Sequence, residues 1–243
     1  MADRDDADST PRAAEQSDML SRRRALTAAG LLAAGAGVTP AQGASSLSSE
    51  QSSKQTVGEA QGPANAVEFR ARFAQTGASG ESFTGYGYLT RAAGVEDAEL
   101  FAGAALNDTT ALLTAYASGD LARRVLDTSV HSLDIVGTLA VYQRGSPGAT
   151  FADPASFQVG VKVAEFDLTL QDILTVFAPA KGIPTLTGSM RQTLAGALAG
   201  GRPRRRFGHV GSDARLFATG LGTLVDPITL NANLEMAGNW VTE

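Results

Sequence analysis

The sequence contains no cysteine and only two histidines in 243 residues. The missing cysteine excludes disulfides, a thiolate nucleophile, cysteine-bound zinc or iron–sulfur clusters, and a bacterial lipoprotein anchor. His131 and His209 are too far apart in the sequence to form a metal-ligand motif. We interpret His131 as a partly buried residue at a strand end and His209 as a loop residue, and we expect no metal site.

The motifs that mark nucleotide sites and nucleophilic serines are also missing. There is no Gly-x-Ser-x-Gly elbow and no phosphate-binding Gly-x-x-x-x-Gly-Lys loop. Gly85-x-Gly87 lacks the third glycine of a dinucleotide fingerprint. The acidic pairs Asp127/Asp134 and Glu165/Asp167 are interpreted as solvated carboxylates. We therefore expect no cofactor, and the catalytic residues, if any, stay unknown.

Basic charge is in short supply, because the formal net charge is −5. A nucleic-acid backbone is bound by an excess of basic side chains, so nucleic-acid binding is not expected. Beyond the N-terminal region, the basic cluster that stands out is "RPRRRF" at 202–207. We interpret it as a solvated turn between two strands; the alternative is an anion-binding patch.

The N-terminal region has the layout of an export signal. In "SRRRALTAAGLLAAGAG" (21–37), a basic group precedes a run of Ala, Gly and Leu that is too short to cross a membrane. Its start resembles the twin-arginine export motif, Ser-Arg-Arg-x-Phe-Leu, through Ser21, Arg22, Arg23 and Leu26, with Ala25 in place of Phe. The resemblance implies the twin-arginine export machinery as a partner, no permanent membrane span, and a location in the cell envelope, the periplasm or outside the cell.

The chain divides into three parts by composition. Residues 1–43 form the signal region, with an acidic, disordered start and a cleavage site expected after Gly43. Residues 44–65 are rich in Ser, Gln and Ala and predict a flexible linker. Residues 66–243 have the length of one ordinary domain.

Apolar and polar residues alternate throughout that domain, which predicts strands with one buried face. In "ITLNANLEMAGNW" the apolar residues from Ile228 to Trp240 share one face, and the polar residues from Thr229 to Asn239 share the other. From Val159 to Asp172 the parity of the apolar positions changes, so a bulge is expected near Ala164-Glu165. About eight strands and little helix predict an all-β fold, namely a small antiparallel β-barrel. The alternative is a β-sandwich.

Three stretches carry a further resemblance: "LDIVGTLAVY", "FADPASFQVGVKVAEF" and "ILTVFAPAKGIPTLTGSM". They resemble segments of uncharacterised exported bacterial proteins, and their strand pattern is similar to that of allene oxide cyclase-like and lipocalin-like barrels. The resemblance covers about residues 66–240 and implies an eight-stranded barrel that encloses a small apolar ligand. It assigns no functional residue.

The strand at 131–143 is largely apolar on both faces, which is typical of a strand that lines a mixed cavity or is covered on both sides. If it lines a cavity, the candidate ligand-binding residues are Tyr86, Tyr88, Arg123, Asp134 and Tyr142. The alternative is core packing.

Three functions fit these observations. The first is an exported, non-enzymatic barrel that binds a small apolar ligand or an envelope component. The second is a cyclase or isomerase that acts in the barrel mouth, and the third is a structural envelope module without a ligand.

Overall fold

The structure is a computed structural model that describes residues 65–200 and 205–243. The twin-arginine motif, the expected cleavage site and nearly all of the linker lie outside these residues, as do Arg202 and Arg204. Within them, no helix is long and apolar enough to cross a membrane.

Eight antiparallel strands form a closed barrel, in which each strand pairs with the next along the chain and the last pairs with the first. The strands are β1 (Ala66–Thr76), β2 (Ser82–Ala92), β3 (Leu113–Asp127), β4 (Val130–Gln143), β5 (Val161–Ala178), β6 (Lys181–Ala195), β7 (Asp213–Asp226) and β8 (Asn231–Thr242). Among the described residues, helical structure is confined to α1 (Asp97–Leu100) and the 3₁₀ turns η1 (Asp108–Thr110) and η2 (Pro154–Gln158). The prediction of an eight-stranded barrel is confirmed, and the alternative of a sandwich is wrong.

Alternation along the strands places one face of each strand in the barrel lumen. On β5, Phe166, Leu168 and Leu170 are buried while Asp167 and Thr169 are exposed. Val163 and Ala164 are both fully buried, and the β5–β6 register shifts between Glu165 and Phe166. The expected bulge is therefore present at the position where the parity of the sequence changes.

The final strand begins later than the alternation predicts. Ile228 is 90% exposed and lies in the turn before β8, which starts at Asn231. The Asp226 carboxylate accepts hydrogen bonds from the Ile228 N–H and the Thr229 hydroxyl, both at 2.8 Å. Leu230 then takes a left-handed φ of 59°, which breaks the extended backbone.

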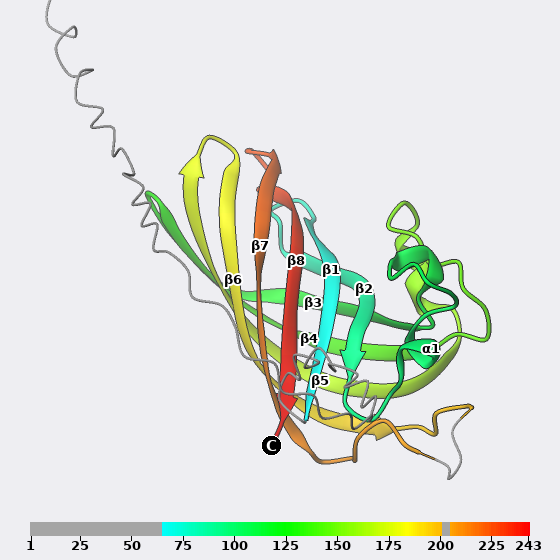
Figure 1. Cartoon of the computed structure of the whole chain (residues 1–243). Helices are drawn as coiled ribbons and strands as arrows, with labels where there is room; N and C mark the ends of the chain where they lie inside the picture. Colours follow the sequence, from blue (N-terminus) through cyan, green and yellow to red (C-terminus); the bar gives the residue numbers. More distant parts are fainter. Residues whose placement is uncertain (1–64, 201–204) are drawn as a thin grey trace, which may run out of the picture. The chain divides into compact units, whose positions relative to one another are not determined.

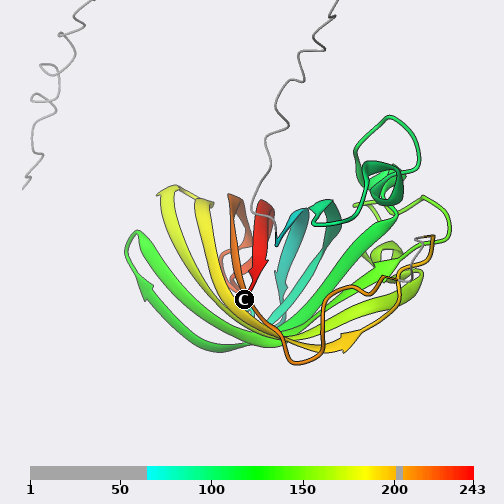
Figure 2. The ribbon, with the colours of Figure 1, turned by 60° about the horizontal axis from the view of Figure 1, so that its bottom comes forward.

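The two ends of the barrel differ. At one end the strands are joined by the tight connections 77–81, 128–129, 179–180 and 227–230. At the other end they are joined by the longer segments 93–112, 144–160 and 196–212. In Figures 1 and 2 the loops around α1 lie on the side away from the β5–β6 hairpin. Both described termini are at the long-loop end, where the Thr242 N–H donates to the Asn65 carbonyl at 3.4 Å.

Aromatic side chains and a folded loop close the long-loop end. The Trp240 ring packs against Phe69 and Phe166, with ring centroids 5.7 and 6.2 Å apart. The buried Gln192 holds the described segment after residue 204, because its Nε2 donates to the Phe207 carbonyl at 2.6 Å. The lumen therefore lacks a wide opening at this end.

Candidate ligand cavity

An apolar cavity opens at the tight-turn end of the barrel. Its volume is about 140 Å³. The side chains that line it come from seven of the eight strands and from two of the tight turns, and most of them are apolar. They are Gln75, Arg124, Leu126, His131, Leu133, Leu174, Val176, Ala180, Lys181, Thr223, Leu224, Leu230, Ala232 and Leu234, with Gly182 and Gly222 between them.

Two smaller cavities continue from this one into the lumen. Their volumes are about 20 and 30 Å³. Leu234 lines both the outer cavity and the first inner one, and Phe73 lines both inner ones. The three spaces thus form a row that leads from the mouth toward Trp240, which lines the innermost.

Basic side chains surround the mouth. Arg124, His131 and Lys181 line the outer cavity, and no acidic side chain is among its described lining residues. The Arg124 guanidinium donates to the carbonyls of Ser79 and Gly80, each at 2.8 Å, and the Lys181 Nζ donates to the Thr223 hydroxyl at 2.9 Å. In the part of the chain that the structure describes, none of these three side chains forms an ion pair.

A buried carboxyl group lies below this mouth. Asp172 of β5 is 2% exposed and lines the first inner cavity. Its Oδ1 accepts the Thr185 N–H at 3.1 Å, and this is its one hydrogen bond among the described residues. Burial raises the pKa of Asp172 to about 6, against the lowering effect of the Thr185 N–H.

Sequence reasoning did not select Asp172, although a signal was available. The residue has the same parity as Phe166, Leu168 and Leu170, so it continues the inward face of β5. An acidic residue at an inward position of an alternating strand indicates a buried carboxyl group. Gln75, Arg124 and Lys181 were missed because cavity mouths depend on which hairpins meet, and local patterns do not contain that information.

Two of the five candidates from the sequence, Tyr86 and Tyr88, lie on β2 beneath the long loops. The Tyr86 ring contacts those of Phe151 and Phe157, with centroids 6.1 and 5.6 Å apart. The Tyr88 ring contacts Phe101 edge-on at 6.0 Å, and burial raises its pKa above the ordinary value. Tyr86 borders the innermost cavity, whereas neither tyrosine lines the mouth.

The other three candidates lie on β3 and β4. Arg123 and Asp134 are cross-strand partners, with Arg123 exposed and Asp134 accepting a hydrogen bond from Gln171 at 3.3 Å. Tyr142 lies at the far end of β4, opposite Lys162. The structure therefore brings Arg123 and Asp134 together and leaves the tyrosines apart from them, so the five residues do not surround one cavity.

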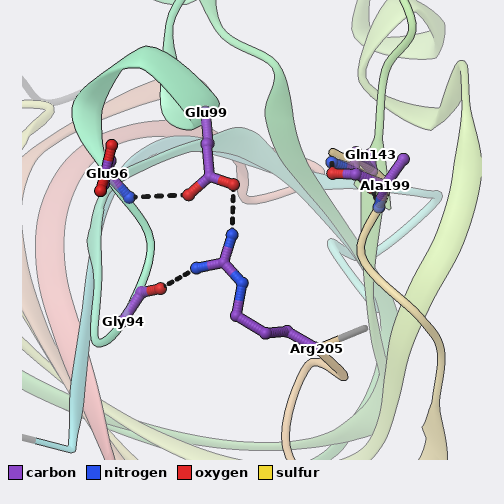
Figure 3. Close-up of polar contacts among 6 residues, drawn as sticks. All are labelled: Gly94, Glu96, Glu99, Gln143, Ala199 and Arg205. Carbon is purple, nitrogen blue, oxygen red and sulfur yellow. Dashed lines mark hydrogen bonds and ion pairs between the residues drawn. The ribbon is translucent and has the colours of Figure 1, made fainter. Parts of the chain in front are cut away.

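The arginine-rich segment is in part a structural contact. Arg205 forms an ion pair with Glu99 of α1 and donates to the Gly94 carbonyl, as Figure 3 shows. Beside it, Gln143 and the backbone of Ala199 exchange two hydrogen bonds of 3.1 and 2.7 Å. These contacts fasten the loop 196–212 to the rest of the long-loop end.

Two other hollows are more polar. One of about 420 Å³ lies on the outer surface, where Arg191 pairs with Asp213 and Arg215 with Glu243. Another of about 180 Å³ lies at the long-loop end, where Leu198 and Phe207 face Phe166 and Trp240 across it. We favour the cavity at the tight-turn end because it combines an apolar lining with a few polar groups, as small-molecule sites do.

Comparison with known proteins does not identify this site. No protein-family model matches the chain, and neither the curated proteins nor the solved structures include a match.

Proposed function

We propose that this protein binds a small, mainly apolar molecule in the outer cavity, which the molecule enters from the tight-turn end. The observation that carries the proposal is the apolar cavity of about 140 Å³ at that end. An engineered apolar cavity of about 150 Å³ is large enough to bind benzene. The bound group is therefore about the size of one ring or a short alkyl chain.

The closed long-loop end supports this direction of entry. Trp240 and Phe166 are 1% exposed, and Phe207 and Leu198 of the loop 196–212 are also buried. A molecule that reached the lumen from that side would have to displace these side chains, whereas the mouth side needs no such displacement.

A pair of matched variants tests the proposal with hexanol as the probe. Ala232 lines the cavity, and Ala237 is exposed on the same strand. Ala232→Leu fills part of the cavity and should weaken hexanol binding, measured by titration calorimetry, at least tenfold. Ala237→Leu should leave it unchanged. No binding to the wild type, together with no ligand mass in native mass spectrometry, would instead support a structural module.

A second candidate function, a cyclase or isomerase, is favoured by Asp172. A carboxyl group whose pKa is about 6 and which lines a cavity can hold or release a proton near neutral pH. If it does so, a ligand co-purified with the protein and incubated in D₂O should gain deuterium on carbon. Asp172→Asn should abolish that gain while binding persists.

We also propose that the protein acts after export by the twin-arginine route. The support is the sequence at Ser21, Arg22, Arg23 and Leu26. Replacing both arginines by lysine should leave the precursor in the cytoplasm, and the wild-type protein recovered from the envelope or medium should begin near residue 44. An intact mass that includes residues 1–43 would contradict the cleavage.

A further inference from the structure

We propose that the ligand is a short-chain amphiphile with an anionic head group at the mouth, beside Arg124, His131 and Lys181, and a hydroxyl group at the inner end, beside Asp172. This inference rests on the proposed binding function and specifies the chemistry of the ligand. It combines two separate observations, one at the mouth of the outer cavity and one in the first inner cavity, which Asp172 lines.

The first observation is that the charged side chains that line the mouth, Arg124 and Lys181, have one sign. The acidic groups at the described tight turns accept hydrogen bonds from neighbours in their own turns: Asp226 from Ile228 and Thr229, Glu81 from the N–H groups of Ala78 and Ser79, and Asp127 from the Thr128 hydroxyl. Basic groups without acidic partners at a low-dielectric opening attract anions. A carboxylate head group can therefore remain at the solvated mouth while its chain enters the cavity.

The second observation is the incomplete hydrogen bonding of Asp172. Its cross-strand neighbours, Leu133 and Leu186, are apolar, and the described residues supply only the Thr185 N–H. A buried polar group without partners is costly in either protonation state. A ligand hydroxyl can donate to the second carboxylate oxygen and so remove that cost.

The strand register gives the length of the ligand. Leu133, the β4 partner of Asp172, lines the outer cavity together with His131. These two residues are separated by two positions, or about 7 Å along a strand. Lys181 is five positions from Leu186, or about 16 Å. A chain of about six carbon atoms fits the shorter of these spans and the cavity volume.

Three probes separate the two ends: hexanol, hexanoate and ω-hydroxyhexanoate, each titrated by calorimetry. We expect hexanoate to bind about fivefold more tightly than hexanol to the wild type, because of the mouth charges. Lys181→Gln should bring the ratio of hexanoate affinity to hexanol affinity close to one. Lys162→Gln is the matched control, because Lys162 pairs with Glu165 at 2.6 Å on β5, outside the cavity lining.

The hydroxyl end is tested with Asp172→Leu, which is close in shape and cannot accept a hydrogen bond. The wild type should bind ω-hydroxyhexanoate about tenfold more tightly than hexanoate, as a hydrogen bond to a charged group allows. The leucine variant should reverse this order, because it buries the hydroxyl without a partner. Asp172→Asn, which preserves polarity, should reduce the preference and serves if the leucine variant does not fold.

The outcomes distinguish this inference from the proposed function. If none of the probes binds, the binding function itself is overturned. If hexanol and hexanoate bind equally well and Lys181→Gln changes neither affinity, the anionic head group is wrong while the apolar site stands. If the added hydroxyl weakens binding equally in the wild type and in Asp172→Leu, the role of Asp172 is wrong.

Discussion

At the residue scale, Asp172 links the site to the stability of the barrel. Its pKa is raised by burial from the ordinary 3.8 to about 6, so the folded state binds a proton that the unfolded chain has already released. The neutral carboxyl group is therefore favoured in the folded protein. Its contribution to stability is complete below about pH 4, decreases as the pH rises to about 6, and is lost above that.

The variant Asp172→Asn tests this pH dependence. The wild type should lose up to about 3 kcal/mol of unfolding free energy between pH 4 and pH 7 through this group. The asparagine variant should lose less over the same range, because its side chain does not ionise. Urea denaturation at several pH values measures both curves. Parallel curves for the two proteins would show that Asp172 ionises in the folded state as readily as in the unfolded one.

At the element scale, the strands can be predicted from the sequence, whereas the segments that pack over them cannot. The alternation on β5 and its change near Ala164 have a local cause, the two-residue repeat of a strand, so sequence reasoning predicts both. The start of β8 depends on the Asp226 turn and the φ of Leu230, which alternation cannot detect. The buried outer face at Tyr86 depends on Phe157, which is far away in the sequence.

The same distinction applies to the candidate site. Inward parity on β5 would have identified Asp172 as a buried carboxyl group, but sequence reasoning did not use this signal. The mouth is formed by the hairpins of β3–β4, β5–β6 and β7–β8, which come together only when the barrel closes. Its basic residues therefore could not be grouped before the structure was known.

The segment containing η2 is an integral part of the fold. Phe157 is fully buried, and its ring lies 5.1 Å from that of Phe151. Its backbone carbonyl accepts the hydroxyl of the buried Thr114 at 2.8 Å. The side chain thus fastens the long loop 144–160 to the outer face of the barrel.

Removing this ring should destabilise the protein. Phe157→Ala should cost about 3–5 kcal/mol, as expected for a large side chain deleted from a packed site. Phe177 is 59% exposed, so Phe177→Ala should change the unfolding free energy by less than about 0.5 kcal/mol. Denaturant titration compares the two variants. Equal effects would mean that the loop does not contribute to the folded core.

At the scale of the whole molecule, closure of the barrel pairs both edges of every strand that the structure describes. The backbone of β1 bonds to β2 on one side and to β8 on the other. An open sheet exposes edges that can pair with another chain, and a closed barrel avoids this hazard. The sheet therefore separates an apolar lumen from solvent, with access at the tight-turn end.

The contact between Asn65 and Thr242 also places the two described ends of the chain side by side. The chain could therefore start at a different strand and still form the same closed barrel. A permuted chain, with residues 65 and 243 joined by a short linker and new ends between Gly145 and Ser146 in an exposed loop, should fold and retain hexanol binding. The same ring cut between Leu168 and Thr169 in β5 should not fold, which circular dichroism and calorimetry would show. A second protein could then be fused to the barrel at any of its exposed loops. The choice of loop decides whether the cavity mouth faces the fused protein or points away from it.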